Sequence, residues 1–333
     1  KLSIMANLST TYMGLKLKNP IIVSSSGLTN SVKDIIALEE KGAAAVITKS
    51  LFEEEIILET EENLNKMHAS GFVYPETTEY FDFDRMEDTV SDYLKFLSDS
   101  KKSVKIPIIA SINCVTSEGW TDFTKRIEDT GVDGLELNVF NLPVNFTDAN
   151  ATNDQVYSDI IEKISKVSKL PISLKIGFYH SNLGYFIKHI SQSPTKAIVL
   201  FNRFYNPDFD IYTLHYTSSY VLSTPAEGAN SLRWVAIMAN RVSCDLSAST
   251  GIHDGTAVIK QLLAGAKTVQ LCSTLYKNGN SQIGIMLSEL EKWMKENDYN
   301  TIDEFRGKMS QSKTFDPKVF ERVQFMKYLR NRE

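Results

Sequence analysis

The sequence has no uninterrupted apolar run near the ~20 residues that a membrane-spanning helix needs, and it has no excess of basic residues. Its 36 Lys and Arg are outnumbered by 41 Asp and Glu, which gives a formal charge of −5 at pH 7. Proteins that bind nucleic acids or anionic membranes normally carry a basic excess. We therefore expect neither nucleic acid nor a membrane as a partner.

Cysteine is scarce. Cys114, Cys244 and Cys272 are odd in number and far apart, so they fit neither a disulfide framework nor paired zinc ligands. We expect no metal site, and a reducing cytoplasm as the location. Residues 1–4 precede Met5 and resemble a cloning remnant, and the residues after Met5 do not resemble a signal peptide.

Short apolar runs alternate with longer amphipathic segments along the whole chain. Each run is of strand length and continuously apolar, as expected for a parallel strand that is buried on both faces. One amphipathic segment opens at Asn153-Asp154 and places Tyr157, Ile160 and Ile164 on a single stripe. The expected strands are 20–23, 44–48, 106–112, 134–138, 172–176, 197–201, 242–247 and 268–271.

Three junctions repeat one arrangement, in which a glycine ends a helix and a buried strand follows. These glycines are Gly42, Gly131 and Gly265, and glycine accepts the left-handed conformation that such helix ends require. Eight strand–helix units with these junctions predict a (β/α)₈ TIM barrel. An open, doubly wound sheet is the alternative, because the sequence pattern does not show closure.

A bare barrel takes ~250 residues, so the chain has room for additions within one domain, 1–333. Residues 12–18 alternate around Gly14 and predict an N-terminal hairpin under the barrel. Segments 51–85 and 204–224 predict long loops after the second and sixth strands, where such barrels place binding sites. Residues 301–333 predict a helical C-terminal appendage.

Polar residues stand at the carboxyl ends of the expected strands, where barrels of this kind assemble their chemistry. The turns after the last two strands, Ser249-Thr250-Gly251 and Cys272-Ser273, suit a phosphate group, although each alone could be a plain turn or helix cap. Lys49 and Lys175 follow apolar strands, and both suit an anionic ligand. Schiff-base chemistry is the competing use of these lysines.

Several segments in this order resemble the dihydroorotate dehydrogenase family of FMN-dependent barrels. The segments that carry the resemblance, from about Leu8 to Tyr299, are Leu15-Lys16-Leu17-Lys18-Asn19-Pro20, Ser26-Gly27, Ile47-Thr48-Lys49-Ser50, Leu135-Glu136-Leu137-Asn138, Ser173-Leu174-Lys175, Ser249-Thr250-Gly251-Ile252 and Gln270-Leu271-Cys272-Ser273.

The resemblance implies FMN as the cofactor and assigns roles to individual residues. Lys175 would approach N1/O2 of the flavin and stabilise its reduced, anionic form. Lys49 would be a catalytic residue near the ring and the substrate, with Ser50 beside it. Asn202 would lie at the substrate face. The other contacts implied to FMN are those of Ser26, Gly27, Asn113 and Asn138 to the flavin, and of Ser249, Thr250, Gly251, Cys272 and Ser273 to its phosphate.

The sequence departs from the family at the site of the catalytic base. Family members carry Cys or Ser there, and this chain has Asn141, whose amide cannot serve as a general base. His68, His180 and Cys114 are substitutes to consider. The two histidines are better read as exposed loop residues and the cysteine as a small buried hydrophobe, so none is assigned a catalytic role.

Three other positions depart from the family pattern. Residues 68–74 replace the stretch that binds orotate, and Asn202-Arg203 replaces an Asn-Ser pair. Thr250 and Cys272 each replace a glycine in the phosphate turns. The flavin site therefore looks retained, whereas the dihydroorotate site looks altered.

Three functions follow as hypotheses. The first is an FMN-dependent oxidoreductase that oxidises a C–C bond of a small, dihydropyrimidine-like cyclic amide, with a homodimer as an open expectation. The second is a flavin-binding protein without dehydrogenase activity. The third is a phosphate-dependent lyase that uses Lys49 or Lys175. Fold analogy alone cannot choose among these three functions. A yellow protein with bound flavin would exclude the third.

Overall fold

Eight parallel strands form the centre of the protein. The computed structural model describes residues 6–53, 75–113, 117–139, 142, 144, 154–204, 206–218 and 221–321. The eight strands are β3 (Ile21–Val23), β4 (Ala45–Ile47), β6 (Ile108–Asn113), β7 (Gly134–Asn138), β8 (Ile172–Ile176), β9 (Ala197–Leu200), β12 (Asp245–Ser249) and β13 (Thr268–Leu271).

The sheet is closed. The strands are hydrogen-bonded in the order β4-β3-β13-β12-β9-β8-β7-β6, and β4 also pairs with β6 through Val46↔Ile108 and Ile47↔Ile109. A short strand, β5 (Leu51–Phe52), continues the sheet beside the end of β6. Closure confirms the predicted (β/α)₈ barrel and excludes the open sheet.

Each expected strand coincides with an observed one, except that the seventh lies two to three residues further along the chain. Strand β12 begins at Asp245, where it pairs with Ala197 of β9, and not at Val242. The physical reason is a competing contact, because the N–H of Ser243 donates to Oγ of Ser191 and so does not join the ladder. An apolar residue before the strand therefore extended the prediction too far.

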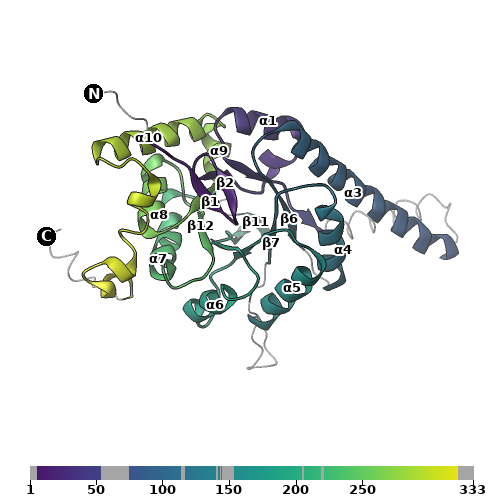
Figure 1. The fold of residues 1–333 in the computed structure, drawn as a ribbon. Coiled ribbons are helices and arrows are strands. Elements are labelled where there is room, and N and C mark those ends of the chain that lie inside the picture. Colours follow the sequence, from purple (N-terminus) through teal and green to yellow (C-terminus); the bar gives the residue numbers. More distant parts are fainter. Residues whose placement is uncertain are drawn as a thin grey trace.

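Helices surround the barrel (Figure 1). The buried stripe predicted for the segment after Asp154 is confirmed, since Tyr157, Ile160, Ile161 and Ile164 of α5 all face the core. The helices are α1 (Val32–Glu40), α3 (Pro75–Ser103), α4 (Ser117–Glu128), α5 (Asp154–Val167), α6 (Leu183–Ile190), α7 (Gly228–Met238), α8 (Gly255–Ala264), α9 (Ser273–Asn278) and α10 (Gln282–Glu296).

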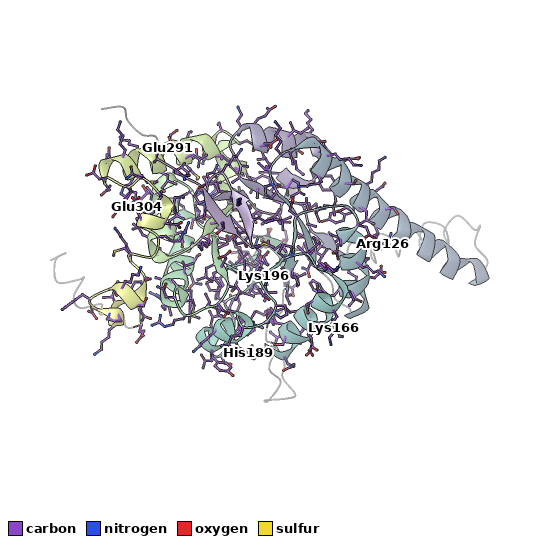
Figure 2. The ribbon with its side chains drawn as sticks, viewed as in Figure 1. Arg126, Lys166, His189, Lys196, Glu291 and Glu304 are labelled. Atoms are coloured by element: carbon purple, nitrogen blue, oxygen red, sulfur yellow. The ribbon has the colours of Figure 1, made fainter. Side chains whose placement is uncertain are left out.

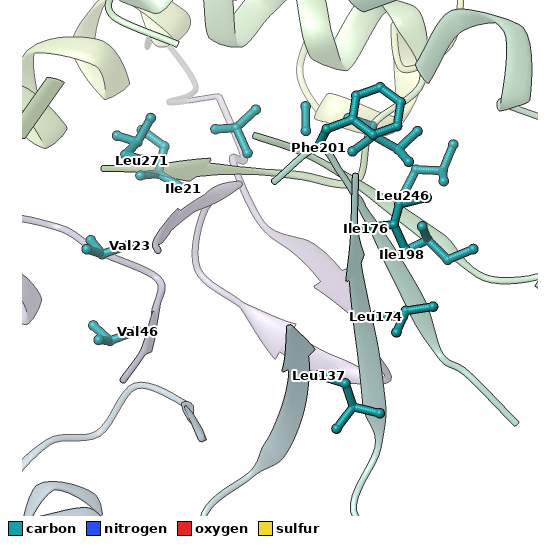
Figure 3. Close-up of a cluster of buried hydrophobic side chains, with 14 of the residues drawn as sticks. Ile21, Val23, Val46, Leu137, Leu174, Ile176, Ile198, Phe201, Leu246 and Leu271 are labelled. Atoms are coloured by element: carbon teal, nitrogen blue, oxygen red, sulfur yellow. The ribbon is translucent and has the colours of Figure 1, made fainter. Parts of the chain in front are cut away.

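The main apolar core joins the strands to the helices around them. Figure 3 shows strand side chains of this core, among them Val23, Val46 and Leu174. Polar side chains cover the outside, as the exposed Lys166 on α5 and His189 on α6 show in Figure 2. Burial of strand side chains on this scale is what fixes the helices against the barrel.

A hairpin of β1 (Thr10–Tyr12) and β2 (Leu15–Leu17) covers the amino-terminal end of the barrel, as predicted. It lies across the middle of the barrel in Figure 1. Tyr12 is fully buried with Ile22, Ile47 and Ile109 in a second apolar cluster. The N–H of Met13 donates to Oδ2 of Asp245 at the start of β12. This end of the barrel is therefore closed.

The predicted insertion after the sixth strand is present as a second hairpin, β10 (Pro207–Asp210) and β11 (His215–Ser218). The prediction of a loop over 51–85 is wrong at its end, because α3 already begins at Pro75. Its acidic and aromatic residues concealed the helical pattern. Residues 54–74 lie outside the described part of the chain.

The C-terminal segment, predicted as a helical appendage, contains three short 3₁₀ helices in its described part: η3 (Ile302–Glu304), η4 (Gln311–Lys313) and η5 (Pro317–Phe320). Phe305, between the first two turns, is fully buried. Among the described residues, none of the helices combines the length and apolar character that crossing a bilayer requires.

Candidate active site

A cavity of about 760 Å³ opens at the carboxyl ends of the strands, opposite the β1–β2 hairpin. It is large enough for a cofactor-sized ligand. Its described lining residues are Ser24, Ser25, Lys175, Asn202, Arg203, Val221, Leu222, Ser223, Ser249, Thr250, Gly251, Ile252, Gln270, Cys272, Ser273 and Tyr276. Seven residues predicted from the sequence line it: Lys175, Asn202, Ser249, Thr250, Gly251, Cys272 and Ser273.

Lys175, at the end of β8, presents a buried ammonium group to this cavity. Its Nζ donates to Oγ of Ser24 at 2.9 Å and to Oε1 of Gln270 at 3.3 Å. Oε1 of Glu136 lies 3.7 Å from the same nitrogen. A buried lysine needs such partners, since an unpaired charge in the interior is costly.

Glu136 and Gln270 were not given roles from the sequence, although Gln270 lines the cavity and Glu136 lies buried behind it, in contact with Gln270 and Lys175. The Glu136 side chain is fully buried on β7, and its Oε2 accepts from Nε2 of Gln270 at 2.7 Å and from Oγ of Ser173 at 3.3 Å. Within the described residues its Oε1 has no hydrogen-bond partner. A carboxylate or amide inside an otherwise apolar strand was the signal that could have identified them.

The other end of the cavity is formed by the turns after β12 and β13. The N–H of Gly251 points at Oγ of Ser223, 3.4 Å away. Gly251 has a φ of 76°, and a Cβ there would lie 2.0 Å from the backbone nitrogen of Gly228. The turn therefore requires glycine at 251, and it presents backbone N–H groups to the cavity.

Cys272 stands immediately before α9 and lines the cavity as a thiol. Burial raises the pKa of this thiol, and the Lys175 charge and a hydrogen bond with Ser26 lower it only in part. Burial also raises the pKa of Cys244 to about 12. Neither residue is therefore a reactive thiolate at neutral pH.

Asn138 and Asn202 meet at the mouth of the barrel. Nδ2 of Asn202 donates to Oδ1 of Asn138 at 2.8 Å. Arg203, the next residue, forms an ion pair with Glu227 in which Nε and Oε2 are 2.7 Å apart. The sixth strand is thus followed by the amide of Asn202, which lines the cavity, and by the guanidinium group of Arg203, which Glu227 holds beside the cavity.

The first two strand ends lie beside the cavity. Oγ of Ser50 lies 3.1 Å from that of Ser25 and 2.7 Å from that of Ser111, which links three neighbouring strand ends. The backbone N–H of Lys49 donates to the carbonyl oxygen of Thr29. Among the described residues, these predicted positions are not part of the cavity lining: Ser26, Gly27, Lys49, Ser50, Asn113 and Asn138.

Gly27 has a specific spatial reason to be glycine. A Cβ at this position would lie 2.8 Å from the hydroxyl oxygen of Tyr276, which lines the cavity. Ser26 caps the short turn η1 (Gly27–Thr29), because its Oγ accepts from the N–H of Leu28. No sequence pattern pointed to Tyr276, since its ring reaches the site only through the placement of α9.

Of the substitute bases, only His180 lies in the described part of the chain. Its side chain is 4% exposed, and Nδ1 lies 2.9 Å from Oδ1 of Asp154. Its ring stacks on Phe186 with centroids 3.9 Å apart. The expectation of an exposed loop histidine is therefore wrong, because the ring packs against α6. Asn141, His68 and Cys114 lie outside the described residues.

The comparisons with known proteins agree with this architecture. The family model described as dihydroorotate dehydrogenase matches residues 83–294, which is more than half of the chain. The chain belongs to the dihydroorotate dehydrogenase family. It is an oxidoreductase of the dihydroorotate dehydrogenase type, in a family whose enzymes are flavoproteins.

Alignments with curated relatives extend over nearly the full length of this chain. The chain is 28% identical over 318 residues to dihydroorotate dehydrogenase B (NAD(+)), catalytic subunit, of Thermoplasma volcanium, covering 91% of this chain and 98% of the relative. It is 24% identical to dihydroorotate dehydrogenase (fumarate) of Lachancea kluyveri, covering 92% and 99%. It is also 23% identical to the chloroplastic dihydropyrimidine dehydrogenase (NADP(+)) of Arabidopsis thaliana, covering 90% and 76%.

Proposed function

We propose that the protein is an FMN-dependent oxidoreductase that oxidises a C–C bond of a small, dihydropyrimidine-like cyclic amide. One observation carries this proposal. A single cavity of about 760 Å³ has the buried ammonium group of Lys175 on its floor and the turns of Gly251 and Ser273 at its other end. A flavin mononucleotide needs a cation near its ring and donors around its phosphate.

The residues present fit FMN. Lys175 would face the ring, and the turns 249–251 and 272–273 would hold the phosphate, where Gly251 leaves no room for a side chain. Bound FMN would supply hydride acceptance. The protein would supply a fixed positive charge from Lys175, amide contacts from Asn202 and Asn138, and walls that exclude water. We keep Lys49 and Ser50 as parts of this proposed site near the flavin ring and the substrate, and Asn113 as a contact to the flavin ring.

The identity of the chromophore tests the proposal directly. We expect the purified protein to be yellow and to release FMN when it is denatured. Replacement of Lys175 by Ala should weaken FMN binding and lower the midpoint potential of the bound flavin, because a cation near N1 favours the anionic reduced form. A colourless protein that cannot be reconstituted with FMN would contradict the proposal.

Membership in the family predicts the substrate less directly than it predicts the cofactor, because Asn141 replaces the usual catalytic base. General-base catalysis is commonly worth ~10²–10⁴ in rate, so dihydroorotate should reduce the flavin very slowly. Anaerobic mixing with a panel of dihydropyrimidines that includes dihydroorotate tests this expectation. Asn141→Cys should raise the rate of flavin reduction by dihydroorotate only slightly, since residues 68–74 also depart from the family. Reduction by dihydroorotate at ~1–10³ s⁻¹ would show that another group acts as the base.

A flavin-binding protein without dehydrogenase activity is the second candidate, and Asn141 is the observation that favours it. A yellow protein that no dihydropyrimidine reduces would support it over the first. A cytoplasmic location and a homodimer are part of the main proposal. Cell fractionation and light scattering of the purified protein test these two features.

A further inference from the structure

A second, smaller cavity of about 200 Å³, which we call the side pocket, lies next to the main cavity. Part of its wall is aromatic, and the amide groups of Asn206 and Asn230 also belong to it. The two cavities share four lining residues, Asn202, Arg203, Ser249 and Thr250. The aromatic residues of the side pocket are Phe178 and Tyr179, which follow β8, and Phe201 and Phe204, which follow β9.

The aromatic rings of the side pocket pack against one another. The rings of Phe178 and Tyr179 are stacked with centroids 4.4 Å apart, and Tyr179 meets Phe204 edge-on at 4.7 Å. Gly177 allows this arrangement, because a Cβ at that position would lie 2.5 Å from the ring of Phe204. Packed rings of this kind suit a further flat ring, which can stack on a face or meet an edge.

Phe178 and Tyr179 carry apolar surface that a ligand can bury. They are 37% and 40% exposed, although they follow a strand that is buried throughout. Phe201 and Phe204 are buried and form the inner side of the pocket. Because transfer of apolar surface out of water is favourable, this wall favours an apolar group.

The polar side chains of the side pocket already have partners within the protein. Oγ1 of Thr250 donates to the carbonyl oxygen of Phe201 at 3.1 Å. Arg203 and Glu227 are the charged residues of the described lining, and they form an ion pair with each other. A charged group would therefore find no unpaired charge among these lining residues, so the pocket favours an uncharged group.

The side pocket adjoins a position at which the chain departs from its family. The resemblance places Asn202 at the substrate face, and Arg203 stands where family members have Ser. Both residues line the main cavity and the side pocket. A substrate that contacts Asn202 in the main cavity can therefore extend a substituent into the side pocket.

We propose that the side pocket binds a flat, uncharged ring of the substrate, which is then a dihydropyrimidine-like cyclic amide with an aryl substituent. This inference rests on the proposed function. An apolar cavity of roughly 150 Å³ is enough to bind benzene, so a cavity of about 200 Å³ accepts one six-membered ring. Dihydroorotate, which carries a carboxylate and no such ring, leaves the side pocket unused.

Calorimetric titration of the FMN-loaded protein with uracil, and with uracils that carry one benzyl group at N3, C5 or C6, tests the inference. These probes are already oxidised, so they bind without reducing the flavin. At least one benzyluracil should bind at least tenfold more tightly than uracil, because its ring leaves water for the aromatic wall.

Three variants locate the ring. Tyr179→Ala removes part of the wall, and Asn230→Trp fills the pocket from α7. Each should reduce the preference for the benzyluracil about tenfold and change the affinity for uracil less than threefold. Tyr185→Ala is the matched control, since Tyr185 is an exposed aromatic residue of α6 outside the described lining, and it should change neither affinity. Circular dichroism identifies any variant that does not fold, and the remaining variants then carry the test.

FMN-loaded protein that binds no benzyluracil more tightly than uracil would overturn the inference and leave the flavin proposal standing. Equal losses for uracil and benzyluracil in Tyr179→Ala and Asn230→Trp would also overturn it, since these residues would then act only in folding. A colourless protein that cannot be loaded with FMN would overturn the proposed function, and the inference with it. A preference for a benzyluracil that Asn230→Trp abolishes and Tyr185→Ala retains supports the assignment.

Discussion

At the scale of single residues, Thr250 combines a site position with an unfavourable backbone conformation. Its φ is 73°, in the left-handed region, where a β-branched residue is strained. Its Oγ1 donates to the carbonyl oxygen of Phe201 at 3.1 Å, which offsets part of the cost. A threonine at this turn therefore stores strain beside the proposed phosphate site.

Thr250→Gly should stabilise the ligand-free protein by ~1 kcal/mol, because relief of a strain of ~1–3 kcal/mol exceeds the added freedom of the unfolded chain. Urea unfolding measures this change. Thr256→Gly, in the helical backbone of α8, is the matched control and should destabilise the protein by ~0.5–1 kcal/mol. Equal destabilisation by the two substitutions would show that Thr250 is not strained.

Asp245, at the start of β12, links stability to pH. Burial raises the pKa of its carboxyl group, and the Met13 N–H with the charges of Lys267 and Arg306 lowers it only in part. Because the folded pKa lies above the unfolded one, ionisation in the fold costs stability. This cost is absent below the unfolded pKa and is complete above the folded pKa.

Asp245→Asn should therefore stabilise the protein at pH 7, since the amide oxygen can still accept the Met13 N–H without a charge. The gain should shrink as the pH falls below the raised pKa of the folded protein, because Asp245 is then protonated in the fold and no longer pays for a buried charge. Urea unfolding of both proteins between pH 4 and pH 7 measures it. A gain that does not vary with pH, or a loss at pH 7, would contradict this explanation.

At the scale of structural elements, two glycine turns differ in what surrounds them. Gly131, after α4, and Gly251, after β12, have φ values of 79° and 76°. A Cβ at Gly131 would meet nothing within 4 Å, whereas one at Gly251 would lie 2.0 Å from the nitrogen of Gly228. The first turn restricts only the backbone, and the second also holds α7 close to β12.

Gly131→Ala should cost ~1 kcal/mol, the penalty for a left-handed alanine. Gly251→Ala should cost clearly more, since the start of α7 must move to admit the methyl group. Thermal unfolding of the two variants without flavin gives this comparison. Similar shifts in Tm would mean that the start of α7 moves away from the turn of Gly251 with no loss of stability.

At the scale of the whole molecule, the C-terminal segment raises the question of one domain or two. Phe305 is fully buried, and its ring packs edge-on against Trp293 with centroids 5.0 Å apart. Nη2 of Arg306 donates to Oγ1 of Thr10 in the first hairpin. We propose that the segment unfolds together with the barrel as a single domain.

Phe305→Ala should then lower the free energy of unfolding of the whole protein by ~3–5 kcal/mol, the usual cost of a cavity of this size. Val319→Ala is the control within the same segment. Its side chain is 49% exposed, so the change should stay within ~0.5 kcal/mol. An unchanged barrel transition in Phe305→Ala, with only local loss of structure, would show that the segment is a separate unit.

The strands could be predicted because each is recorded locally, as a continuous apolar run between amphipathic segments. The error at Val242 and the missed start of α3 at Pro75 have a related cause. A strand end or a helix start depends on which distant group takes the backbone hydrogen bonds, as Ser191 does at Ser243. Such partners leave no mark in the neighbouring residues.

The residues of the candidate site also fall into those that local sequence patterns predicted and those that they did not. Lys175 and the turns around Gly251 were predicted, because a polar residue after an apolar strand marks the carboxyl end of that strand. Ser223 and Tyr276 were not, since each reaches the cavity from a segment with no pattern of its own. Glu136 and Gln270 were quoted within motifs, but no role was inferred, because their pairing joins strands that are 134 residues apart.

The sequence by itself therefore determined the alternation of strands and helices, the (β/α)₈ prediction and the resemblance to the dihydroorotate dehydrogenase family. These features depend on local periodicity and on short motifs, both of which are written in consecutive residues. Closure through the pairing of β4 with β6, and the convergence of Ser223, Lys277 and Gly251 at one end of the cavity, were decided only by the tertiary structure. The physical reason is that both are long-range contacts, whose geometry is fixed only when the packed core brings distant segments together.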